Sequence, residues 1–491
     1  MKPYVIGVDL GTGSAKALAI ATDGNVVDTA QLPYPTLQPQ PGYQEQDPAQ
    51  IEEAFIRCIA TLTRRQGYPP QAIALSSAMH SLIALDGKHQ RLTRAIIWAD
   101  NRSATLAREL HQSPAAQSLY EETGTPIHPM SPLCKLLWLR QEHPDIFSRA
   151  EKFISIKEYL WHRLFDTFEV DYSIASATGL LNILGRRWHD DALALAHIAT
   201  EQLSLLTPPT HSRTCARKDL CTEMGIDTST PFLIGSSDGC LATLGSFANE
   251  PGTVSLTIGT SGAVRVTRDS PVLNFSAMIF NYLLDENTFV CGGPSNNGGV
   301  ALRWYAETVR GLRLETIADY QSLLVELDDS QPGAHGLVFL PYVLGERAPV
   351  WNSEACGVFF GLRTHHQPAD FTRAVVEGIS SALYDIADSM IQAGLDIKKV
   401  HVSGGFIHST AWLQVLADLF GKRISLVGSA DASAYGAGML ALKAIGAISD
   451  FNALLPAEAR SFSPEPAHMS AYRELFLRYK KVYQATHHLM L

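Results

Sequence analysis

Short apolar runs alternate with longer amphipathic stretches along the whole chain. The short runs are rich in β-branched and aliphatic residues and predict strands at Tyr4–Val8, Ala15–Ala21, Ile73–Ser76, Phe232–Ile234, Val254–Ile258, Ala263–Val266, Phe289–Cys291, Leu337–Leu340 and Val400–Ser403. Apolar residues at three- and four-residue spacing predict helices at Ile51–Thr63, Leu133–Gln141, Ala374–Ala393 and Trp412–Leu419. Strands that alternate with helices indicate an α/β protein with mixed sheets.

One strand–turn–strand pattern occurs twice, once in each half of the chain. The first copy turns at Gly11-Thr12-Gly13-Ser14 and the second at Gly259-Thr260-Ser261-Gly262. Each turn lies between two apolar runs, as in a β-hairpin whose tip exposes backbone N–H groups and hydroxyls. Because glycine has no Cβ, such a tip can approach an anion closely. Two copies suggest two similar lobes that hold a polyphosphate between them, whereas one copy alone would be a weak signal.

Length and composition fit a large folded protein with two domains. The chain has 491 residues, of which 46% are hydrophobic and 18% charged. The Pro-Gly turn in Asn249-Glu250-Pro251-Gly252 is the best candidate boundary, which predicts lobes at 1–248 and 249–491. A formal net charge of −10 argues against nucleic acid or an anionic membrane as a partner. We therefore expect a small-molecule ligand.

Cysteine usage and the N-terminus predict a cytoplasmic location. The 7 cysteines are scattered, and the nearest pair, Cys215 and Cys221, lacks the second pair that a zinc site needs. Free thiols in a reducing compartment are the expectation, without a structural metal. The short apolar run before Asp9 is not typical of a signal peptide, and no apolar run approaches the roughly 18 residues of a membrane span.

Acidic and hydroxyl residues at two strand ends suggest phosphoryl-transfer chemistry. Asp9 ends the first predicted strand, where a carboxylate could hold Mg²⁺ directly or through water. Thr12 and Ser14 add hydroxyl donors, and Lys16 could neutralise developing phosphoryl charge. Asp238 follows the run Phe232–Ile234 and could accept a proton from an alcohol. The alternative is a plain Asp-containing turn at Asp9 and a tight Asp-Gly turn at Asp238.

Glycines and polar clusters at other strand ends are candidates for ligand contact. Gly404 and Gly405 could allow a flat approach of adenine and ribose, although a routine strand-to-helix turn has the same pattern. Met79-His80 and the segment Trp98–Arg102 place hydrogen-bonding groups beside thioether or aromatic surface. Each of these residues alone is a weak signal, because a single His or Arg is more often structural or solvated.

Together these segments resemble the FGGY carbohydrate kinases, a branch of the actin-like, hexokinase-like ATPases, from Tyr4 to about Gly446. The motifs that carry the resemblance are Asp9-Leu10-Gly11-Thr12-Gly13-Ser14, Trp98-Ala99-Asp100-Asn101-Arg102, Met130-Ser131-Pro132-Leu133-Cys134-Lys135-Leu136-Leu137-Trp138, Gly235-Ser236-Ser237-Asp238, Gly259-Thr260-Ser261-Gly262, Gly345-Glu346-Arg347-Ala348-Pro349-Val350-Trp351, Ser403-Gly404-Gly405 and Ala434-Tyr435-Gly436-Ala437-Gly438. The resemblance implies two actin-like (ribonuclease H-like) α/β lobes around a central cleft.

The resemblance also implies a role for each matching residue. Asp238 would be the catalytic base and would place Mg²⁺ together with Asp9. The expected ATP-binding residues are Gly11, Thr12, Gly13, Ser14, Lys16, Gly259, Thr260, Ser261, Gly299, Arg303, Gly404, Gly405 and Ser409. The expected acceptor-binding residues are Met79, His80, Trp98, Asp100, Arg102 and Asp238. Lys16 departs from relatives that carry arginine, which keeps the charge but loses bidentate contact with phosphate.

The expected acceptor is D-gluconate, which would become 6-phosphogluconate. The segments Ala78–Leu82, Ile154–Leu160 and Asp171–Gly179 look most like the gluconokinase members of the family, and xylulokinases tend to have glycine at Ser81. The alternatives are a xylulokinase or another ketose or polyol kinase, and a non-catalytic regulator that binds sugar and nucleotide. His80, Arg102 and Lys157 are unranked candidates for the carboxylate. Many relatives form dimers, so a homodimer is one expected state.

Overall fold

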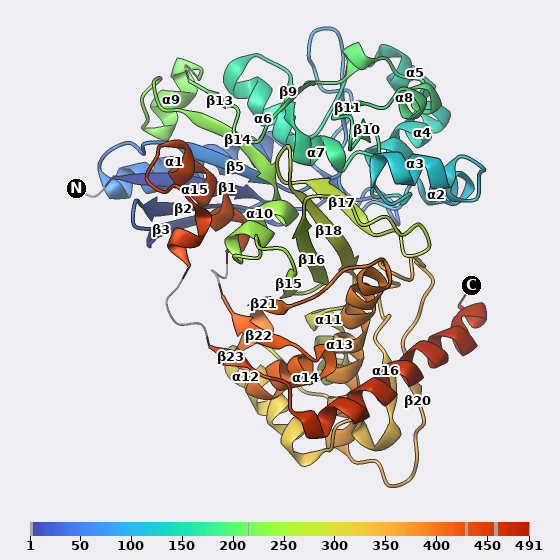
Figure 1. The fold of residues 1–491 in the computed structure, drawn as a ribbon. Coiled ribbons are helices and arrows are strands. Elements are labelled where there is room, and N and C mark those ends of the chain that lie inside the picture. Colours follow the sequence, from blue (N-terminus) through green and yellow to red (C-terminus); the bar gives the residue numbers. More distant parts are fainter. Residues whose placement is uncertain (1–2, 215, 428–430, 456–459, 491) are drawn as a thin grey trace.

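The computed structural model describes residues 3–214, 216–427, 431–455 and 460–490, and Figure 1 shows two lobes, each built on its own sheet. The mixed α/β fold class is confirmed. Cys215 lies outside the described residues, while Cys58, Cys134, Cys240 and Cys291 are buried free thiols. None of the helices in these ranges is long and apolar enough to cross a membrane.

The N-terminal sheet has six strands in the order β13-β14-β5-β1-β2-β3. Its strands are β1 (Tyr4–Leu10), β2 (Ser14–Ala21), β3 (Val26–Pro33), β5 (Ile73–Ser77), β13 (Ser212–Arg213) and β14 (Phe232–Ser237). β1, β2 and β3 form an antiparallel meander, and β5 and β14 add in parallel beside β1. The carboxyl ends of the three parallel strands therefore meet at one edge, where the chain leaves β1 at Leu10, β5 at Ser77 and β14 at Ser237.

The C-terminal sheet has seven strands in the order β17-β18-β16-β15-β21-β22-β23. Its strands are β15 (Thr253–Ile258), β16 (Gly262–Arg268), β17 (Phe280–Leu283), β18 (Phe289–Ser295), β21 (Lys399–Gly404), β22 (Arg423–Leu426) and β23 (Ser461–Phe462). β15, β16 and β18 form the meander, and β21 and β22 add in parallel beside β15. This order repeats that of the N-terminal sheet, so the two glycine-rich hairpins occupy equivalent positions.

Short strand pairs and helices complete the two lobes. The pairs are β4 (Glu45–Gln46) with β7 (Ala95–Ile96), β6 (Ile83–Leu85) with β8 (Lys152–Ile154), β9 (Glu169–Asp171) with β12 (Leu205–Thr207), β10 (Leu181–Asn182) with β11 (Arg187–Trp188), and β19 (Val338–Leu340) with β20 (Val358–Phe360). The α-helices are α1 (Pro48–Gln66), α2 (Ala104–His111), α3 (Ala116–Thr123), α4 (Pro132–Glu142), α5 (Pro144–Arg149), α6 (Ile156–Phe165), α7 (Tyr172–Ser176), α8 (Asp190–Ala196), α9 (Lys218–Met224), α10 (Asp238–Gly245), α11 (Gly299–Trp304), α12 (Ile317–Leu324), α13 (Pro368–Gln392), α14 (Thr410–Phe420), α15 (Ala432–Ala444) and α16 (Pro466–Thr486).

Helix starts explain why α1 and α4 extend beyond their predicted ranges. Asp47 caps α1 by accepting from Ala49 N–H, and Ser131 caps α4 by accepting from Cys134 N–H. Each helix then begins with proline, whose missing N–H would be unpaired there in any case. The apolar periodicity that predicts these helices begins three residues into α1 and one residue into α4, after the capping residue and the proline.

Helix α15 comes from the C-terminal half of the chain but packs on the N-terminal sheet and along α10. Glycine makes the close approach possible. A Cβ on Gly7 would lie 2.0 Å from the Ala434 carbonyl oxygen, and one on Gly436 would lie 2.1 Å from that of Leu241. Backbone therefore meets backbone where the chain returns to the first lobe.

Candidate active site

Asp238 is the first residue of α10, immediately after β14 ends at Ser237. Ser237 caps the helix by accepting from Cys240 N–H at 3.4 Å, and Gly239 N–H donates to Asp238 Oδ1 at 2.7 Å. Burial raises the pKa of Asp238 above its usual range, while the Arg265 charge opposes the rise. A carboxylate with a raised pKa that lines a cleft is suited to take a proton from an alcohol near neutral pH.

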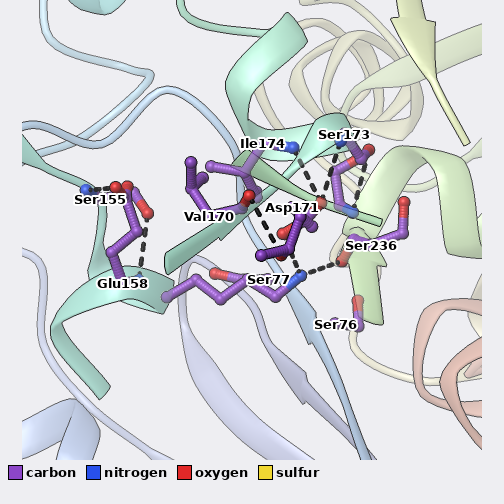
Figure 2. Close-up of polar contacts among 12 residues, drawn as sticks. Ser76, Ser77, Ser155, Glu158, Val170, Asp171, Ser173, Ile174 and Ser236 are labelled. Atoms are coloured by element: carbon purple, nitrogen blue, oxygen red, sulfur yellow. Dashed lines mark hydrogen bonds and ion pairs between the residues drawn. The ribbon is translucent and has the colours of Figure 1, made fainter. Parts of the chain in front are cut away.

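A buried polar network supports the strand end that carries Asp238. Lys157 Nζ donates to Asp171 Oδ2 at 2.7 Å and to the Ser236 carbonyl oxygen at 3.0 Å. Figure 2 shows Asp171 also accepting from the N–H groups of Ser173 and Ile174, each at 3.0 Å. Ser173 Oγ in turn donates to Ser237 Oγ at 2.7 Å. The network ties α6 and α7 to the end of β14, and so fixes the residue before Asp238.

Asp9 in β1 provides a second, half-buried carboxylate near Asp238. Ser76 Oγ donates to Asp9 Oδ1 at 2.6 Å. Burial raises the pKa of Asp9 to about 7, and the neighbouring Asp238 carboxylate adds to the rise. Each carboxylate disfavours ionisation of the other, because two negative charges at short distance repel. A bound divalent cation relieves this repulsion, and carboxylate oxygens are ligands that Mg²⁺ prefers. The donor set therefore fits the expected metal.

The first hairpin tip reaches the acceptor side of the site through Thr12. Trp98 Nε1 donates to Thr12 Oγ1 at 2.8 Å, and Gly11 N–H donates to the Ser14 carbonyl oxygen at 3.1 Å across the turn. A Cβ on Gly13 would meet nothing within 4 Å, so this part of the tip is open. Lys16 is directed to the start of α15, where it pairs with Asp431.

The second hairpin tip forms one wall of a cavity of about 310 Å³ in the C-terminal lobe. Expected nucleotide residues that line the cavity are Gly259, Thr260, Gly299, Arg303, Gly405 and Ser409. Gly404 has φ 116°, and a Cβ there would lie 2.1 Å from the Ile258 carbonyl oxygen, so only glycine fits beside β15. The size is within the usual range for a small-molecule site, and the lining is mainly apolar, as a purine ring requires.

A second cavity, of about 300 Å³, lies between the two lobes. Its N-terminal lining residues are Thr12, Met79, His80, Trp98, Met130 and Asp238. Its C-terminal lining residues are Thr257, Gly259, Ser261, Gly262, Ala263, Arg265, Phe280, Tyr282, Pro294 and Arg347. Because Gly259 lines both cavities, the hairpin tip lies between the candidate nucleotide site and this interlobe cleft.

His80 is a neutral, fixed part of the interlobe cleft. Its Nδ1 lies 2.8 Å from the Ala177 carbonyl oxygen, which makes Nδ1 the protonated nitrogen. Its Nε2 faces the Tyr282 hydroxyl at 3.4 Å. Burial lowers the pKa of His80 to about 3, and the Lys135 charge contributes, so the ring carries no charge at neutral pH.

Asp100 and Arg102 lie apart from the cleft lining, although the sequence predicted both as acceptor ligands. Arg102 Nε and Nη2 donate to the two Asp100 oxygens, each at 2.8 Å, and Nη2 also reaches Glu45 at 2.8 Å. The guanidinium packs 3.9 Å from the Tyr43 ring centroid, and Asp100 is completely buried. This closed network braces the loop that carries Trp98.

Two cleft arginines were not among the predicted site residues. Arg265 lies on β16. Arg347 lies in the loop between β19 and β20, with its guanidinium 4.8 Å from the Trp98 ring centroid. Among the described residues, Arg265 Nη1 and Arg347 Nε are buried without a hydrogen-bond partner. The sequence motif that contains Arg347 is one of those that carry the family resemblance. No signal in the sequence, however, shows that Arg347 lacks an ion-pair partner in the folded protein.

These features define a two-lobe α/β phosphotransferase, with a candidate nucleotide cavity, a candidate acceptor cleft and a candidate base at the cleft. Family models for the N-terminal and C-terminal domains of the FGGY family of carbohydrate kinases match residues 4–245 and 254–445. The chain belongs to this family, and it is a kinase that phosphorylates a sugar hydroxyl.

Relatives in this family carry two different substrate names. The chain is 39% identical to a gluconokinase from Bacillus licheniformis, over 97% of this chain and 94% of that protein. A solved gluconate kinase from Lactobacillus acidophilus superimposes with a TM-score of 0.94 at 34% identity, covering 99% of this chain and 98% of that one. A ligand-bound xylulose kinase structure from the same organism gives a TM-score of 0.95 at 34% identity and the same coverage.

Proposed function

We propose that this protein transfers the γ-phosphoryl group of ATP to the C6 hydroxyl of D-gluconate, with Asp238 as general base. The observation that carries the proposal is the position of Asp238 in a cleft that shares the tip residue Gly259 with the candidate nucleotide cavity. An acceptor in the cleft could therefore meet the γ-phosphate of a nucleotide bound on the other side of the tip. The gluconokinase relative at 39% identity supports gluconate as the acceptor.

In the proposed reaction, Asp238 takes the hydroxyl proton as the C6 oxygen attacks the γ-phosphorus. The bond between that phosphorus and the β–γ bridging oxygen breaks as the new P–O bond forms, and ADP leaves. Asp9 and Asp238 would hold Mg²⁺, which supplies charge neutralisation at the phosphate oxygens. The fixed network beneath Ser237 keeps Asp238 oriented, so little reorganisation is needed during transfer.

The proposed nucleotide contacts come from both hairpins and from the C-terminal cavity. The first tip contributes Gly11, Thr12, Gly13 and Ser14, with Lys16 beside it. The cavity contributes Gly259, Thr260, Gly299, Arg303, Gly405 and Ser409, and we add Ser261 from the second tip and Gly404 from the end of β21. The proposed acceptor contacts are Met79, His80 and Trp98, which line the cleft with Asp238. We also propose a cytoplasmic location, which the buried free thiols and the use of ATP support.

The test is ADP formation by purified protein with Mg²⁺-ATP and a panel of gluconate, D-xylulose, glycerol, ribulose and fuculose. We expect gluconate to give the highest kcat/KM, with 6-phosphogluconate as product. The xylulose kinase structure at a TM-score of 0.95 makes D-xylulose the second candidate. A higher kcat/KM on D-xylulose would keep the phosphoryl-transfer mechanism and overturn the substrate.

A further inference from the structure

The interlobe cleft contains two arginines, Arg265 and Arg347, that form no ion pair with another described residue. Neither Arg265 nor Arg347 lies within the 4.0 Å ion-pair distance of a carboxylate among the described residues. Arg265 Nη1 and Arg347 Nε are buried and lack a hydrogen-bond partner there. Both side chains are half-buried, and a cation that loses contact with water is normally paired, because its desolvation is costly otherwise. An anionic ligand in the cleft would supply that partner.

The other basic residues that could bind an acceptor carboxylate already have partners or are uncharged. Lys157 is paired with Asp171, and Arg102 with Asp100 and Glu45. Lys135, which lies close to His80, donates to the carbonyl oxygens of His80, Ile96 and Ile97 at 2.5, 3.2 and 2.8 Å. His80 itself is uncharged at neutral pH.

The two arginines differ in how much of their hydrogen-bonding capacity is used. Arg347 Nη2 donates to the Ser295 carbonyl oxygen at 3.2 Å, and its guanidinium packs on Trp98. Arg265 lies beside the start of α10, since a Cβ on Gly239 would be 3.4 Å from Arg265 Nε. Arg265 has no hydrogen bond or ion pair among the described residues, and its main charge interaction there is with Asp238. Arg265 is therefore the less satisfied of the two.

We infer that Arg265 and Arg347 form the subsite that binds the carboxylate of a sugar-acid acceptor, with Arg265 as the main ligand. The inference rests on the proposed function and names the residues that select gluconate over a neutral sugar. The guanidinium plane presents paired N–H donors that match the two oxygens of a carboxylate. Both arginines belong to the C-terminal lobe, whereas Asp238 belongs to the N-terminal lobe, so the acid end and the reacting hydroxyl of one acceptor are held by opposite lobes.

The test compares gluconate with D-glucitol, which has the same carbon chain but a CH₂OH group in place of the carboxylate. We expect Arg265→Gln to lower the ratio of kcat/KM on gluconate to kcat/KM on D-glucitol by roughly 10- to 150-fold, the usual worth of a charge-assisted hydrogen bond. Arg347→Gln should lower the ratio less. Arg268→Gln, on the same strand but outside the cleft lining, is the matched control and should leave the ratio unchanged.

Measurements on Arg265→Lys, and calorimetry, keep the test decisive if Arg265→Gln misfolds or turns over too slowly. Arg265→Lys keeps the positive charge. Its ratio of kcat/KM on gluconate to kcat/KM on D-glucitol should therefore lie between the ratios of Arg265→Gln and the wild type. Where turnover is too slow, the dissociation constant for gluconate should rise by the same factor in Arg265→Gln, with the melting temperature and ATP affinity near those of the wild type. Equal losses for both acceptors, or an unchanged gluconate affinity, would overturn the inference and assign Arg265 to Asp238 or to the phosphoryl group.

The same experiment separates failure of the inference from failure of the proposed function. Wild-type protein that phosphorylates gluconate, with an unchanged ratio in Arg265→Gln, overturns the inference alone. Wild-type protein that prefers D-glucitol or D-xylulose and binds gluconate weakly overturns both. Absence of turnover on every acceptor overturns the proposed function, while gluconate binding that weakens in Arg265→Gln would still support the carboxylate subsite.

Discussion

Asp238, Asp9 and Glu377 are carboxylates whose surroundings raise their pKa values, with different consequences. Asp238 lines the cleft and Asp9 lies beside it, where a raised pKa suits a base and a pair of metal ligands. Glu377 lies in α13, far along the chain from either hairpin, with Arg373 Nη1 3.2 Å from Oε1. Its Oε2 is buried without a partner among the described residues, so this group affects stability and not the reaction.

Glu377 predicts a pH dependence of stability. Burial raises its pKa to about 7, against 4.5 for an ordinary Glu. The folded state therefore holds a proton that the unfolded state has released between these values, and the free energy of unfolding falls as the pH rises from about 4.5 through about 7. The slope from one such group is at most about 1.4 kcal/mol per pH unit. Urea unfolding of wild type and Glu377→Gln at pH 5 to 8 should show a steeper loss in the wild type.

An exposed glutamate provides the control for that experiment. Glu354→Gln, on the surface, should leave the pH profile of stability unchanged. Parallel profiles for the wild type and Glu377→Gln would show that Glu377 has no raised pKa in the folded protein.

At the scale of elements, the ends of β1, β5 and β14 bring Asp9, Ser76 and Asp238 to one edge of the N-terminal sheet. This arrangement was predictable, because strand ends and glycine turns are encoded by adjacent residues. Side-chain pairing was not, since the partners of Arg102 and Lys157 come from segments up to 79 residues apart. The sequence therefore identified Lys157 as a candidate ligand, whereas it is paired with Asp171 beneath the site.

We predict that the substitution Lys157→Met strongly lowers the free energy of unfolding. The substitution leaves Asp171 buried without its cation, and breaking a buried pair in this way costs about 3–5 kcal/mol. Chemical denaturation measures the loss. Lys218→Met, at an exposed position in α9, should change the free energy of unfolding by less than about 0.5 kcal/mol. A loss in Lys157→Met as small as in this control would contradict the role given to the buried pair.

We predict that the substitution Gly7→Ala loosens the contact between β1 and α15. The added Cβ would lie 2.0 Å from the Ala434 carbonyl oxygen, so the helix must move away from the sheet. Overpacking of this kind costs about 1–3 kcal/mol, which thermal or urea unfolding would detect. Gly87→Ala has open space around its Cβ and serves as the control. Equal stability of the two variants would contradict the close packing of α15.

At the scale of the whole molecule, the two sheets share one strand order, apart from the additional edge strand β17 in the C-terminal lobe, and each holds one hairpin tip (Figure 1). The cleft lies between the two lobes. The duplication was predictable from the repeated glycine turns. The return of α15 to the first lobe was not, because helix periodicity shows that a face is apolar without showing which sheet it covers. The sequence likewise does not show that Arg265 and Arg347 have unpaired donor atoms, because hydrogen-bond partners depend on how the two lobes assemble.

The central claim is that the two lobes deliver phosphate from ATP to an acceptor whose proton is taken by Asp238. The most direct measurement is the rate of ADP formation from Mg²⁺-ATP and gluconate by the wild type and by Asp238→Asn, with ATP affinity measured in parallel. We predict that kcat falls by roughly 10²- to 10⁴-fold in Asp238→Asn while ATP still binds. Near-normal turnover by Asp238→Asn would contradict the account.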